Sequence, residues 1–598
     1  MEISRKMNNR QLANLLRSIA AAYEVKEENR FRINAYERAA ATIEHLPNEV
    51  RDIWKDGGDL TEIPGVGSSI ASHLNELFRK GEVVYFKRAL RDLPKAMFEI
   101  LRIPGIGAKT AYKLCLELGI KDPKKAIEKL KMATKKGEIS KIEGFASKSE
   151  KEILEGIKEL KNRKEKMNLS FAQGLAQKMI DYLSEKGKNK DILKIYPLGS
   201  LRRMSAMIGD VDIAVATKKP KDVIKKFINF PEAEKVVVAG KNTARIIYRG
   251  RQIDLKTMDP ESFGSLLQHF TGSKEHNIHL REIAQKKDLS LSEYGIKKKI
   301  KGKLQLKKYR SEEDFYKSLG MEWIPPELRE DRGEIEAAQK GNLPDLIEQK
   351  DIKGDLHIHS DFPVEPSHDL GVDSIKKILK EAVKLKYEYI GVSEHNPSVS
   401  KHSKKDIIDI LKRKKDYIDE INYSRGNKLP VYVFNGLEID IKPNGELAIP
   451  EEGFKYLDFA IVSVHSRFRM SLDEATKRVL EALKHPQAKI LGHPTGRLLG
   501  WREGYDLDWD KIFDVCKKND KWLEINAWPN RLDLQDEIAK EAVKNGVKMV
   551  INTDAHAANQ LGFIKYGIAT ARRGWVSKND IINTMSYNKI SKILKGGE

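Results

Sequence analysis

The chain has 598 residues and a formal net charge of +21. At about 150 residues per domain this length allows about four domains, so the size of the hydrophobic core is not limiting. With 40% hydrophobic and 33% charged residues, the composition excludes a disordered chain. The positive charge favours a polyanion, nucleic acid first, as the partner.

Cysteine usage and hydropathy indicate the cellular setting. Cys115 and Cys516 are far apart in the sequence, which excludes a disulfide framework or a cysteine-based zinc site and favours a reducing compartment. The polar N-terminus "MEISRKMNNRQLANLL" lacks a signal-peptide core. No stretch of about 18 consecutive apolar residues predicts a transmembrane helix. We therefore expect a cytoplasmic protein without a membrane partner.

Residues 8–165 are predicted to be helical, with breaks marked by glycine and proline. "IPGVG" at 63–67 recurs as "IPGIG" at 103–107 and, more weakly, as "IEGFA" at 142–146. The proline sets up a turn, and the glycines let backbone N–H groups approach a phosphate at the start of the following helix. A tight turn between packed helices would explain one copy. Repetition in a basic chain instead predicts helix-hairpin-helix contacts with the DNA backbone. The residues expected to make them are Gly65, Gly67, Gly105, Gly107 and Lys109.

From about residue 166 the pattern mixes strands and helices. The apolar runs "VDIAVA", "KVVVAG", "ARIIYR" and "QIDLKTM" predict strands. The segment 294–310, "YGIKKKIKGKLQLKKYR", alternates apolar and basic residues, as a half-exposed strand pair would. "EWIPPELRE" at 322–330 interrupts the pattern. We therefore predict the main domain boundary between 326 and 350.

Two aspartates flank one valine at the start of the first of these strands. Residues i and i+2 of a strand point the same way, so Asp210 and Asp212 present two carboxylates on one face. Such ligands suit Mg²⁺ or Mn²⁺. Asp254, in a neighbouring strand-like run, is the candidate third carboxylate of a two-metal site. An exposed Asp-Val-Asp on an edge strand is the alternative. A Gly-Ser turn and two arginines just upstream favour a triphosphate site instead.

These features resemble the family X DNA polymerases of the DNA polymerase beta type, over residues 1 to about 320. The resemblance rests on "RINAYERAA", the glycine repeats, "GSLRR…GDVD", "IDL", "FTGSKEHN" and "SEYGI". It implies that the three aspartates bind metal, that Arg281 touches the template side, and that further residues contact the nucleotide or its triphosphate. These further residues are Gly199, Ser200, Arg203, Gly209, Phe270, Thr271, Gly272 and Asn277.

The chain departs from this family at several positions. "MSAM" follows Arg203, where the family usually has glycine and polar residues, and Gln252 replaces an arginine often seen two residues before the third aspartate. His269 stands where animal enzymes carry a tyrosine near the sugar. Where beta-type enzymes use a lysine as a Schiff-base nucleophile, the matching positions here read Ser69 and His73. An imidazole cannot form that Schiff base, so we expect weak or absent deoxyribose-phosphate lyase activity.

Residues 351–598 contain seven short apolar runs that each end in a polar, metal-capable or catalytic-type residue. They are "DLHIHS", "YIGVSEH", "YVFNGLEID", "FAIVSVH", "KILGHP", "WLEIN" and "KMVINTDAH". Helical stretches separate most of them, which is the layout of a β/α barrel. One strand-end histidine is usually structural. Many together with carboxylates suit Zn²⁺, Mn²⁺ or Fe²⁺ and phosphoester hydrolysis. The candidate ligands are His357, His359, His395, Glu438, His465, His493, Asp554 and His556.

This region, over about 351–585, resembles the PHP (polymerase and histidinol phosphatase) domain. The resemblance implies up to three Mn²⁺ or Zn²⁺ ions and 3′→5′ exonuclease activity, with 3′-phosphatase or abasic-site cleavage as further options. Val364 stands where the first motif normally has a ligand aspartate. Glu365, His368 or Asp369 could substitute, and we favour Asp369. Arg497 in "GHPTGR" is expected to bind substrate phosphate, with a surface salt bridge as the alternative. "SEH" at 393–395 replaces the usual S/T-D-H.

The predicted fold is multidomain. All-α helix-hairpin-helix domains are expected at 1–85 and 86–165, an α+β palm and thumb at 166–258 and 259–325, a linker at 326–350, and a distorted seven-stranded β/α barrel at 351–598. We expect a monomeric DNA polymerase that uses deoxynucleoside triphosphates on gapped, nicked or primer–template DNA, with Mg²⁺ or Mn²⁺ in the palm. It would fill gaps in base excision repair. The alternatives are a template-independent nucleotidyltransferase and a DNA-end-binding scaffold in which only the nuclease is active.

Overall fold

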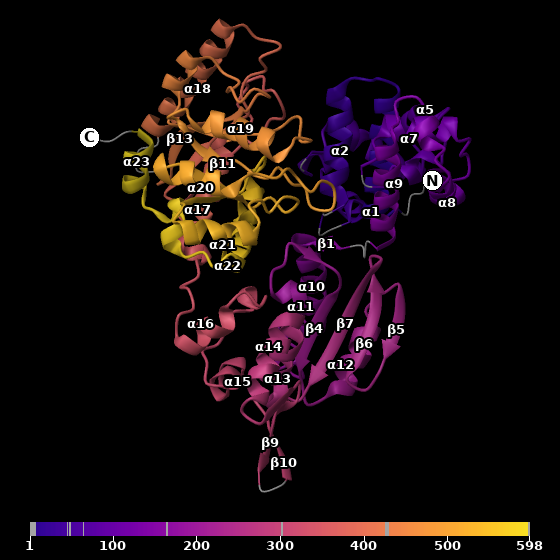
Figure 1. Ribbon diagram of the computed structural model, residues 1–598, viewed down its shortest axis with the longest axis vertical. Coiled ribbons are helices and arrows are strands. Elements are labelled where there is room, and N and C mark those ends of the chain that lie inside the picture. The colour runs from indigo at the N-terminus through magenta and orange to yellow at the C-terminus, as the bar shows by residue number, and fades with distance from the viewer. Residues whose placement is uncertain are drawn as a thin grey trace. The chain divides into compact units, whose positions relative to one another are not determined.

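The computed structural model describes residues 7–595 except 45, 47–48, 64, 104, 163–165, 301–302 and 425–429. The chain divides into two compact units, Met1–Lys166 and Met167–Glu598. Figure 1 shows the first unit in indigo and purple and the second in magenta to yellow. In the part of the chain that is described, no helix combines the length and the apolar character needed to cross a membrane.

The first unit is helical, as predicted. In its first helix the Asn8 side chain accepts the Gln11 N–H, and the Gln11 side chain accepts the Asn8 N–H, a capping box that fixes where the helix begins. One face of this helix, including Leu12 and Leu16, is buried in the core of the unit. The helices are α1 (Asn9–Val25), α2 (Arg30–Glu44), α3 (Val50–Lys55), α4 (Ser68–Lys80), α5 (Val84–Leu90), α6 (Met97–Ile100), α7 (Ala108–Glu117), α8 (Ala126–Lys135) and α9 (Ser147–Asn162).

The glycine repeats form the turns that lead into α4 and α7. Gly65 and Gly105 have φ angles of 77° and 85°, a region that a side chain would disfavour. Gly67 and Gly107 are the N-cap residues of the two helices. A Cβ added at either N-cap would meet no atom within 4 Å, so open space lies in front of both helix starts. The prolines of the two repeats, Pro64 and Pro104, lie outside the described residues.

The second unit begins with the palm sheet, whose strand order is β2-β4-β7-β6-β5. The predicted strands are confirmed. The parallel pairing of β4 with β7 sets Asp212 opposite Asp254, and the antiparallel pairing of β6 with β7 sets Arg245 opposite Asp254. The elements are β1 (Met167–Asn168), α10 (Leu169–Ser184), β2 (Lys194–Pro197), α11 (Gly199–Arg202), β3 (Met207–Ile208), β4 (Val211–Ala216), α12 (Pro220–Ile228), β5 (Lys235–Ala239), β6 (Thr243–Tyr248) and β7 (Arg251–Met258).

The thumb follows, and its strand pair β9–β10 confirms the alternating pattern at 294–310. Figure 1 shows this hairpin extending from the thumb helices. The segment predicted to be a linker instead contributes α16, and Leu328, Ile335 and Leu346 pack into the thumb core. The elements are α13 (Phe263–Thr271), α14 (Lys274–Gln285), β8 (Leu289–Ser292), β9 (Gly295–Ile300), β10 (Lys303–Lys307), α15 (Glu312–Ser318) and α16 (Glu334–Lys340).

The C-terminal part is a parallel sheet ordered β11 to β17 that curls towards closure, as the His359 N–H donates to the Ala555 carbonyl at 2.8 Å. Gly391 and Gly436 leave room for the Phe459 ring, which a Cβ at Gly436 would approach to 2.5 Å. The strands are β11 (Gly354–Ile358), β12 (Tyr389–Val392), β13 (Tyr432–Asp440), β14 (Phe459–Ser463), β15 (Ala488–Leu491), β16 (Trp522–Asn526) and β17 (Met549–Asn552). The helices are α17 (Ile375–Lys384), α18 (Lys404–Ser424), α19 (Leu472–Leu483), α20 (Trp509–Lys518), α21 (Asp536–Asn545), α22 (Ile564–Arg573) and α23 (Tyr587–Lys595).

The barrel and the palm share one apolar cluster. Leu532, Tyr566 and Ala569 of the barrel pack with the core residues of the palm. At the rim of this cluster the side-chain amide of Asn168 donates to the side-chain oxygen of Asn530 at 2.7 Å. The barrel is therefore packed against the palm as part of the same compact unit.

A buried ion triad joins the palm to the thumb. Glu312 accepts hydrogen bonds from Arg202 at 2.9 Å and from Arg329 at 2.6 Å, and its side chain is 4% exposed. Burial alone would raise the pKa of Glu312, but the two guanidinium groups outweigh it and lower the pKa to about 2. The charged triad therefore stabilises this junction.

Removing the shared carboxylate should weaken the junction. In Glu312→Gln we expect faster amide hydrogen exchange across residues 312–330 and a free energy of unfolding lower by about 3 kcal/mol, since breaking a buried ion pair typically costs about 3–5 kcal/mol. In the wild-type protein the contribution of Glu312 should be complete above its ordinary pKa of 4.5 and disappear as the pH falls towards about 2.

The control is Glu313→Gln, which neutralises the adjacent exposed carboxylate. Equal hydrogen-exchange rates in the two variants, measured by mass spectrometry from pH 2 to 7, would contradict a stabilising role for the triad.

Candidate functional site

Three carboxylates lie close together on the neighbouring strands β4 and β7 of the palm sheet, near the start of β4. Asp210 is exposed just before β4, Asp212 is the second residue of that strand, and Asp254 is its partner on β7. Burial first, and then the negative charges of Asp210 and Asp254, raise the pKa of Asp212 to about 6. This concentration of negative charge suits a divalent cation.

The third carboxylate is engaged by an arginine from the neighbouring strand. Arg245 Nε lies 2.6 Å from Asp254 Oδ1, and Arg245 Nη2 lies 2.8 Å from Oδ2. Gln252 adds a weaker bond of 3.2 Å to Oδ2. Arg245 thus supplies, from β6, the guanidinium that is absent at position 252. Its charge also lowers the pKa of Asp212 against the larger effect of burial.

The residues implied for the triphosphate lie beside these aspartates. Instead of the predicted turn, Gly199 and Ser200 open the short helix α11. Gly199 has a φ of 57°, and a Cβ there would lie 3.5 Å from Asp212 Oδ2. Arg203 pairs with Glu330 at 3.0 Å and donates to the Thr271 carbonyl. Arg202 is bound in the Glu312 triad.

The residues implied for the sugar and base lie around the end of α13. A Cβ on Gly272 would lie 3.1 Å from a guanidinium nitrogen of Arg203. Asn277 donates from Nδ2 to the His269 carbonyl at 2.8 Å, and its Oδ1 accepts from Gln268. The Lys256 ammonium lies 4.4 Å from the centre of the Phe270 ring. Phe270, Thr271 and Gly272 therefore lie next to Arg203. Burial lowers the pKa of His269, and the positive charge of Arg281 acts in the same direction.

The barrel gathers its histidines around one glutamate. Glu438 Oε2 lies 2.9 Å from His395 Nδ1 and 3.3 Å from His357 Nε2, while its Oε1 lies 2.9 Å from His493 Nε2 and 3.3 Å from His465 Nε2. All of these side chains except that of His465 are at least nine-tenths buried. Burial opposes ionisation of Glu438, but the imidazoles, His395 and His465 first, lower its pKa well below the ordinary value. With imidazoles beside each of its two oxygens, Glu438 could contribute both oxygens as ligands if metal ions were bound.

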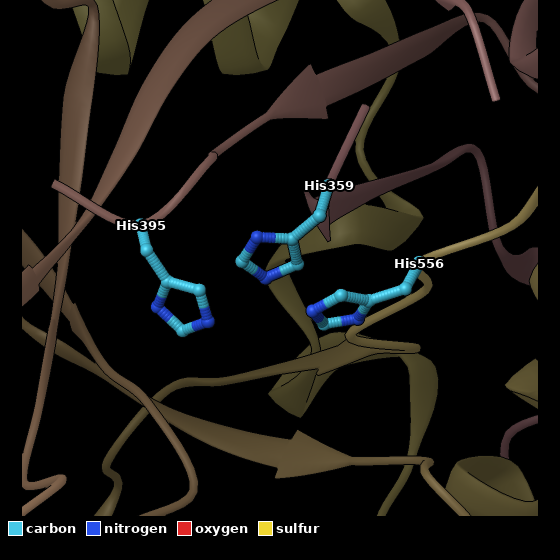
Figure 2. Close-up of side chains that lie close together, drawn as sticks. All are labelled: His359, His395 and His556. Carbon is cyan, nitrogen blue, oxygen red and sulfur yellow. The ribbon is translucent and has the colours of Figure 1, made fainter. Parts of the chain in front are cut away.

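Asp554 and His556 complete the cluster from the opposite side. Asp554 Oδ1 lies 3.2 Å from His359 Nε2 and 3.5 Å from His357 Nε2. Figure 2 shows the rings of His359, His395 and His556 side by side. The ring centres of His359 and His556 are 4.1 Å apart.

The loop after β11 brings Asp369 near two of the candidate histidines. Asp369 Oδ1 lies 3.8 Å from His395 Nε2, and its Oδ2 lies 3.7 Å from His556 Nε2. Of the other candidates, Glu365 pairs with His402, and His368 lies 3.0 Å from Asp440. Because a Cβ on Gly371 would lie 2.1 Å from the His359 carbonyl oxygen, this glycine permits the close return of the loop. Asp369 remains our predicted ligand.

The cluster fits divalent metal ions. The buried atoms His357 Nε2, His359 Nε2, His465 Nε2, His556 Nε2 and Glu438 Oε2 have no hydrogen-bond partner among the described residues. Unpaired buried nitrogens are costly unless a ligand satisfies them. In the described part of the chain, every group of three or more potential ligands with atoms within 4.8 Å lies in the barrel. The palm carboxylates do not form so tight a group while Arg245 engages Asp254.

Supporting carboxylates behind the histidines were missed by sequence reasoning. Glu524 lies 2.7 Å from His357 Nδ1, and Asp440 lies 2.7 Å from His465 Nδ1. Such partners orient a metal-binding imidazole. Both residues stand in the quoted runs "WLEIN" and "GLEID", but the histidine that each one contacts is set by the packing of distant strands. Arg245 gave no local signal because it meets Asp254 only through strand pairing.

The remaining predicted residues have the following surroundings. Arg497 donates from Nε to the Arg531 carbonyl at 2.9 Å and from Nη2 to the Leu532 carbonyl. Lys109 pairs with Glu27 at 2.7 Å on the surface of the first unit, and Gly209 is exposed directly before Asp210.

Family models match parts of the helical unit, the thumb and the barrel, and one relative matches nearly the whole chain. A helix-hairpin-helix domain model matches residues 7–83, a SAM-like helix-hairpin-helix tandem matches 57–121 and 97–159, the DNA polymerase beta thumb matches 266–330, and the PHP domain matches 355–527. The DNA polymerase/3′-5′ exonuclease PolX of Bacillus subtilis is 32% identical, over 98% of this chain and 100% of the relative.

Two further relatives match parts of the chain. A probable phosphatase of Thermoanaerobacter pseudethanolicus is 26% identical over 40% of this chain and 94% of its own length. The repair DNA polymerase X of African swine fever virus is 27% identical over 27% of this chain and 99% of its own length. Both relatives are matched over nearly their whole length, although each covers less than half of this chain.

The bidentate hold on Asp254 leads to a prediction for Arg245→Ala. We expect the Mg²⁺ concentration at half-maximal nucleotide insertion to fall roughly tenfold, since a charge-assisted hydrogen bond worth about 1.5 kcal/mol no longer competes with the metal. We expect kcat to fall as well, because Asp254 loses its fixed orientation. Arg245→Lys should recover part of kcat.

Lys241→Ala, which removes an exposed cation from the turn just before β6, is the control. An unchanged Mg²⁺ requirement in Arg245→Ala, measured in steady-state insertion assays, would show that the guanidinium does not compete for Asp254.

Proposed function

Since this chain belongs to the family X DNA polymerases that carry a C-terminal PHP domain, we propose that it fills short gaps in duplex DNA during base excision repair. The chain is an enzyme that combines nucleotidyl transfer with 3′-5′ exonuclease activity, and both depend on divalent metal ions. The observation that carries the proposal is the register of β4 and β7, which sets Asp212 beside Asp254 with Asp210 two residues away.

In the palm we propose that Asp210, Asp212 and Asp254 hold Mg²⁺ or Mn²⁺. The metal ions would activate the primer 3′-hydroxyl and neutralise charge on the leaving pyrophosphate. Arg203 would donate to the triphosphate, with Gly199 and Ser200 leaving room for its oxygens.

The end of α13 would complete the nucleotide pocket. Phe270, Thr271 and Gly272 would line the sugar, and Asn277 would contact the minor-groove edge of the base. Arg281 would contact the template strand.

In the barrel we propose up to three Mn²⁺ or Zn²⁺ ions, held by the histidines, Glu438, Asp554 and Asp369. Metal ions in such a site supply a hydroxide for attack on a phosphodiester. Glu524 and Asp440 would hold His357 and His465 in orientation by accepting their Nδ1–H groups. The same hydrolytic site would also suit a 3′-phosphate or an abasic site.

The first unit would hold the DNA. The turns at Gly65–Gly67 and Gly105–Gly107 present backbone N–H groups at the starts of α4 and α7, where phosphate oxygens are favoured. Lys109 would add a charge contact to the backbone. We propose that the enzyme works as a monomer in the cytoplasm.

Two single substitutions should separate the two activities. On a one-nucleotide gap with Mg²⁺ or Mn²⁺, we expect Asp210→Ala to abolish insertion and retain 3′-end removal, because only the palm loses a ligand. We expect His359→Ala to give the reverse. Primer extension and degradation are read on the same gel.

The same assay tests the alternatives. Equal extension of single-stranded and gapped primers by the wild type would establish the template-independent enzyme. Insertion at the wild-type rate by Asp210→Ala would exclude the palm as the site of transfer.

The surroundings of His73 on α4 yield a prediction about lyase activity. His73 Nδ1 lies 2.8 Å from the Tyr36 hydroxyl, and its ring stacks on Tyr85 at 4.6 Å. Burial lowers the pKa of His73, and an imidazole forms no Schiff base. Borohydride trapping with a 5′-deoxyribose-phosphate substrate should therefore give little or no covalent adduct. A strong adduct mapped to residues 7–85 would overturn this prediction.

A further inference from the structure

An arginine that the predicted site did not include lies at the rim of the metal cluster. Arg531 belongs to a short loop that leaves the end of β16 and returns, closed by paired backbone hydrogen bonds between Asn526 and Asp533. Within the loop the Arg531 N–H donates to the Trp528 carbonyl at 2.8 Å. The Nε atom of Arg531 lies 3.7 Å from Asp554 Oδ2, and its side chain is 19% exposed.

The guanidinium of Arg531 lies beside one candidate metal ligand, Asp554, and its side chain is partly reachable from solvent. A phosphodiester that enters this cluster must approach Glu438, Asp554 and Glu524, and these carboxylates repel it.

The guanidinium of Arg531 has one long ion-pair contact, with Asp554 at 3.7 Å. The side chain of Arg531 donates no hydrogen bond to any residue within the described ranges. The side chains of Arg497 and Arg502, in contrast, both donate hydrogen bonds to backbone carbonyls. Arg497 donates to the carbonyls of Arg531 and Leu532, and Arg502 donates to the Gly496 carbonyl and lies over the Phe468 ring. Asp554 already accepts a hydrogen bond from another residue, since Asn526 donates to its Oδ2 at 3.1 Å.

We propose that Arg531 binds the scissile phosphate of a DNA strand in the barrel, and that Arg497 positions Arg531 by holding its loop. The proposal rests on the exonuclease function proposed above. A guanidinium can donate two parallel N–H groups to a phosphate, and the N–H groups of the Arg531 side chain donate no hydrogen bond within the described residues. Arg531 is a substrate-binding residue, and Arg497, enclosed by the loop carbonyls, is a positioning residue.

The competing explanation is that Arg531 only neutralises Asp554. The two roles predict different measurements. A neutralising role changes how much metal the barrel retains. A phosphate-binding role changes the affinity for an anion and leaves the metal content unchanged.

The test uses the full-length protein loaded with Mn²⁺, with a single-stranded oligonucleotide as substrate. For Arg531→Gln we expect the KM for the oligonucleotide and the inhibition constant of inorganic phosphate to rise about tenfold to a hundredfold, the range for a lost charge-assisted hydrogen bond. Bound manganese, measured by mass spectrometry, and nucleotide insertion in the palm should stay at wild-type values. Arg531→Lys should recover part of the phosphate affinity.

Arg413→Gln, which removes an exposed arginine from α18, is the matched control. If Arg497 acts through Arg531, then Arg497→Gln should raise the same constants, and the double variant should be little worse than Arg531→Gln alone. Additive losses would mean that Arg497 binds the phosphate independently.

Loss of manganese from Arg531→Gln with an unchanged inhibition constant would overturn the proposal in favour of neutralisation. A wild-type KM and inhibition constant would overturn it as well. If the wild-type protein removed no nucleotides, the exonuclease function would fail instead. Calorimetric titration of inorganic phosphate into the same variants would then still decide whether Arg531 binds the anion.

Discussion

Negative charge crowded at the ends of strands is the constraint on which both candidate sites depend. In the palm, the charges of Asp210 and Asp254 add to the effect of burial on Asp212. In the barrel, Glu438 lies within 3.6 Å of five imidazoles. Like charges so close together in a low dielectric repel strongly. Each site therefore needs protein cations in addition to metal ions.

The two sites meet this need differently. The palm uses one guanidinium, Arg245, which engages both oxygens of Asp254. The barrel uses several imidazoles, which differ in their charge. Burial lowers the pKa of His359 and favours its neutral form, whereas carboxylates raise the pKa of His465 to about 10 against burial and favour its protonated form. In the barrel, the spread of histidines leaves room for several metal ions. In the palm, a metal ion would have to share the Asp254 carboxylate with Arg245.

Charge pairing also connects the sites to the framework. Glu330 joins Arg203, expected at the triphosphate, to Arg573 of the barrel at 3.0 and 2.7 Å. A bound triphosphate and Glu330 would thus compete for the guanidinium of Arg203. This arrangement ties the nucleotide pocket to the wall of the barrel.

Much of this organisation could be read from the sequence because it is local. The fold class, the palm strands and the seven barrel strands followed from alternation and apolar runs, and Asp210, Asp212 and the histidines followed from their places at strand ends. Arg245, Glu524 and Asp440 could not be found, since their partners are set by strand pairing across many residues. The helix α16 was missed because the prolines and glycines around it indicate a linker, while its apolar side chains meet the thumb core only in three dimensions.

The loop from Asn526 to Asp533 contacts both the barrel and the palm. Arg531 faces the metal cluster of the barrel, while Leu532 is buried in the apolar core of the palm. A mutation that lengthens or shortens this loop would disturb two active centres at once. A barrel exchanged between relatives would also leave a hole in the recipient palm. The length of this loop is therefore set from two sides, by the barrel at Arg531 and by the palm core at Leu532.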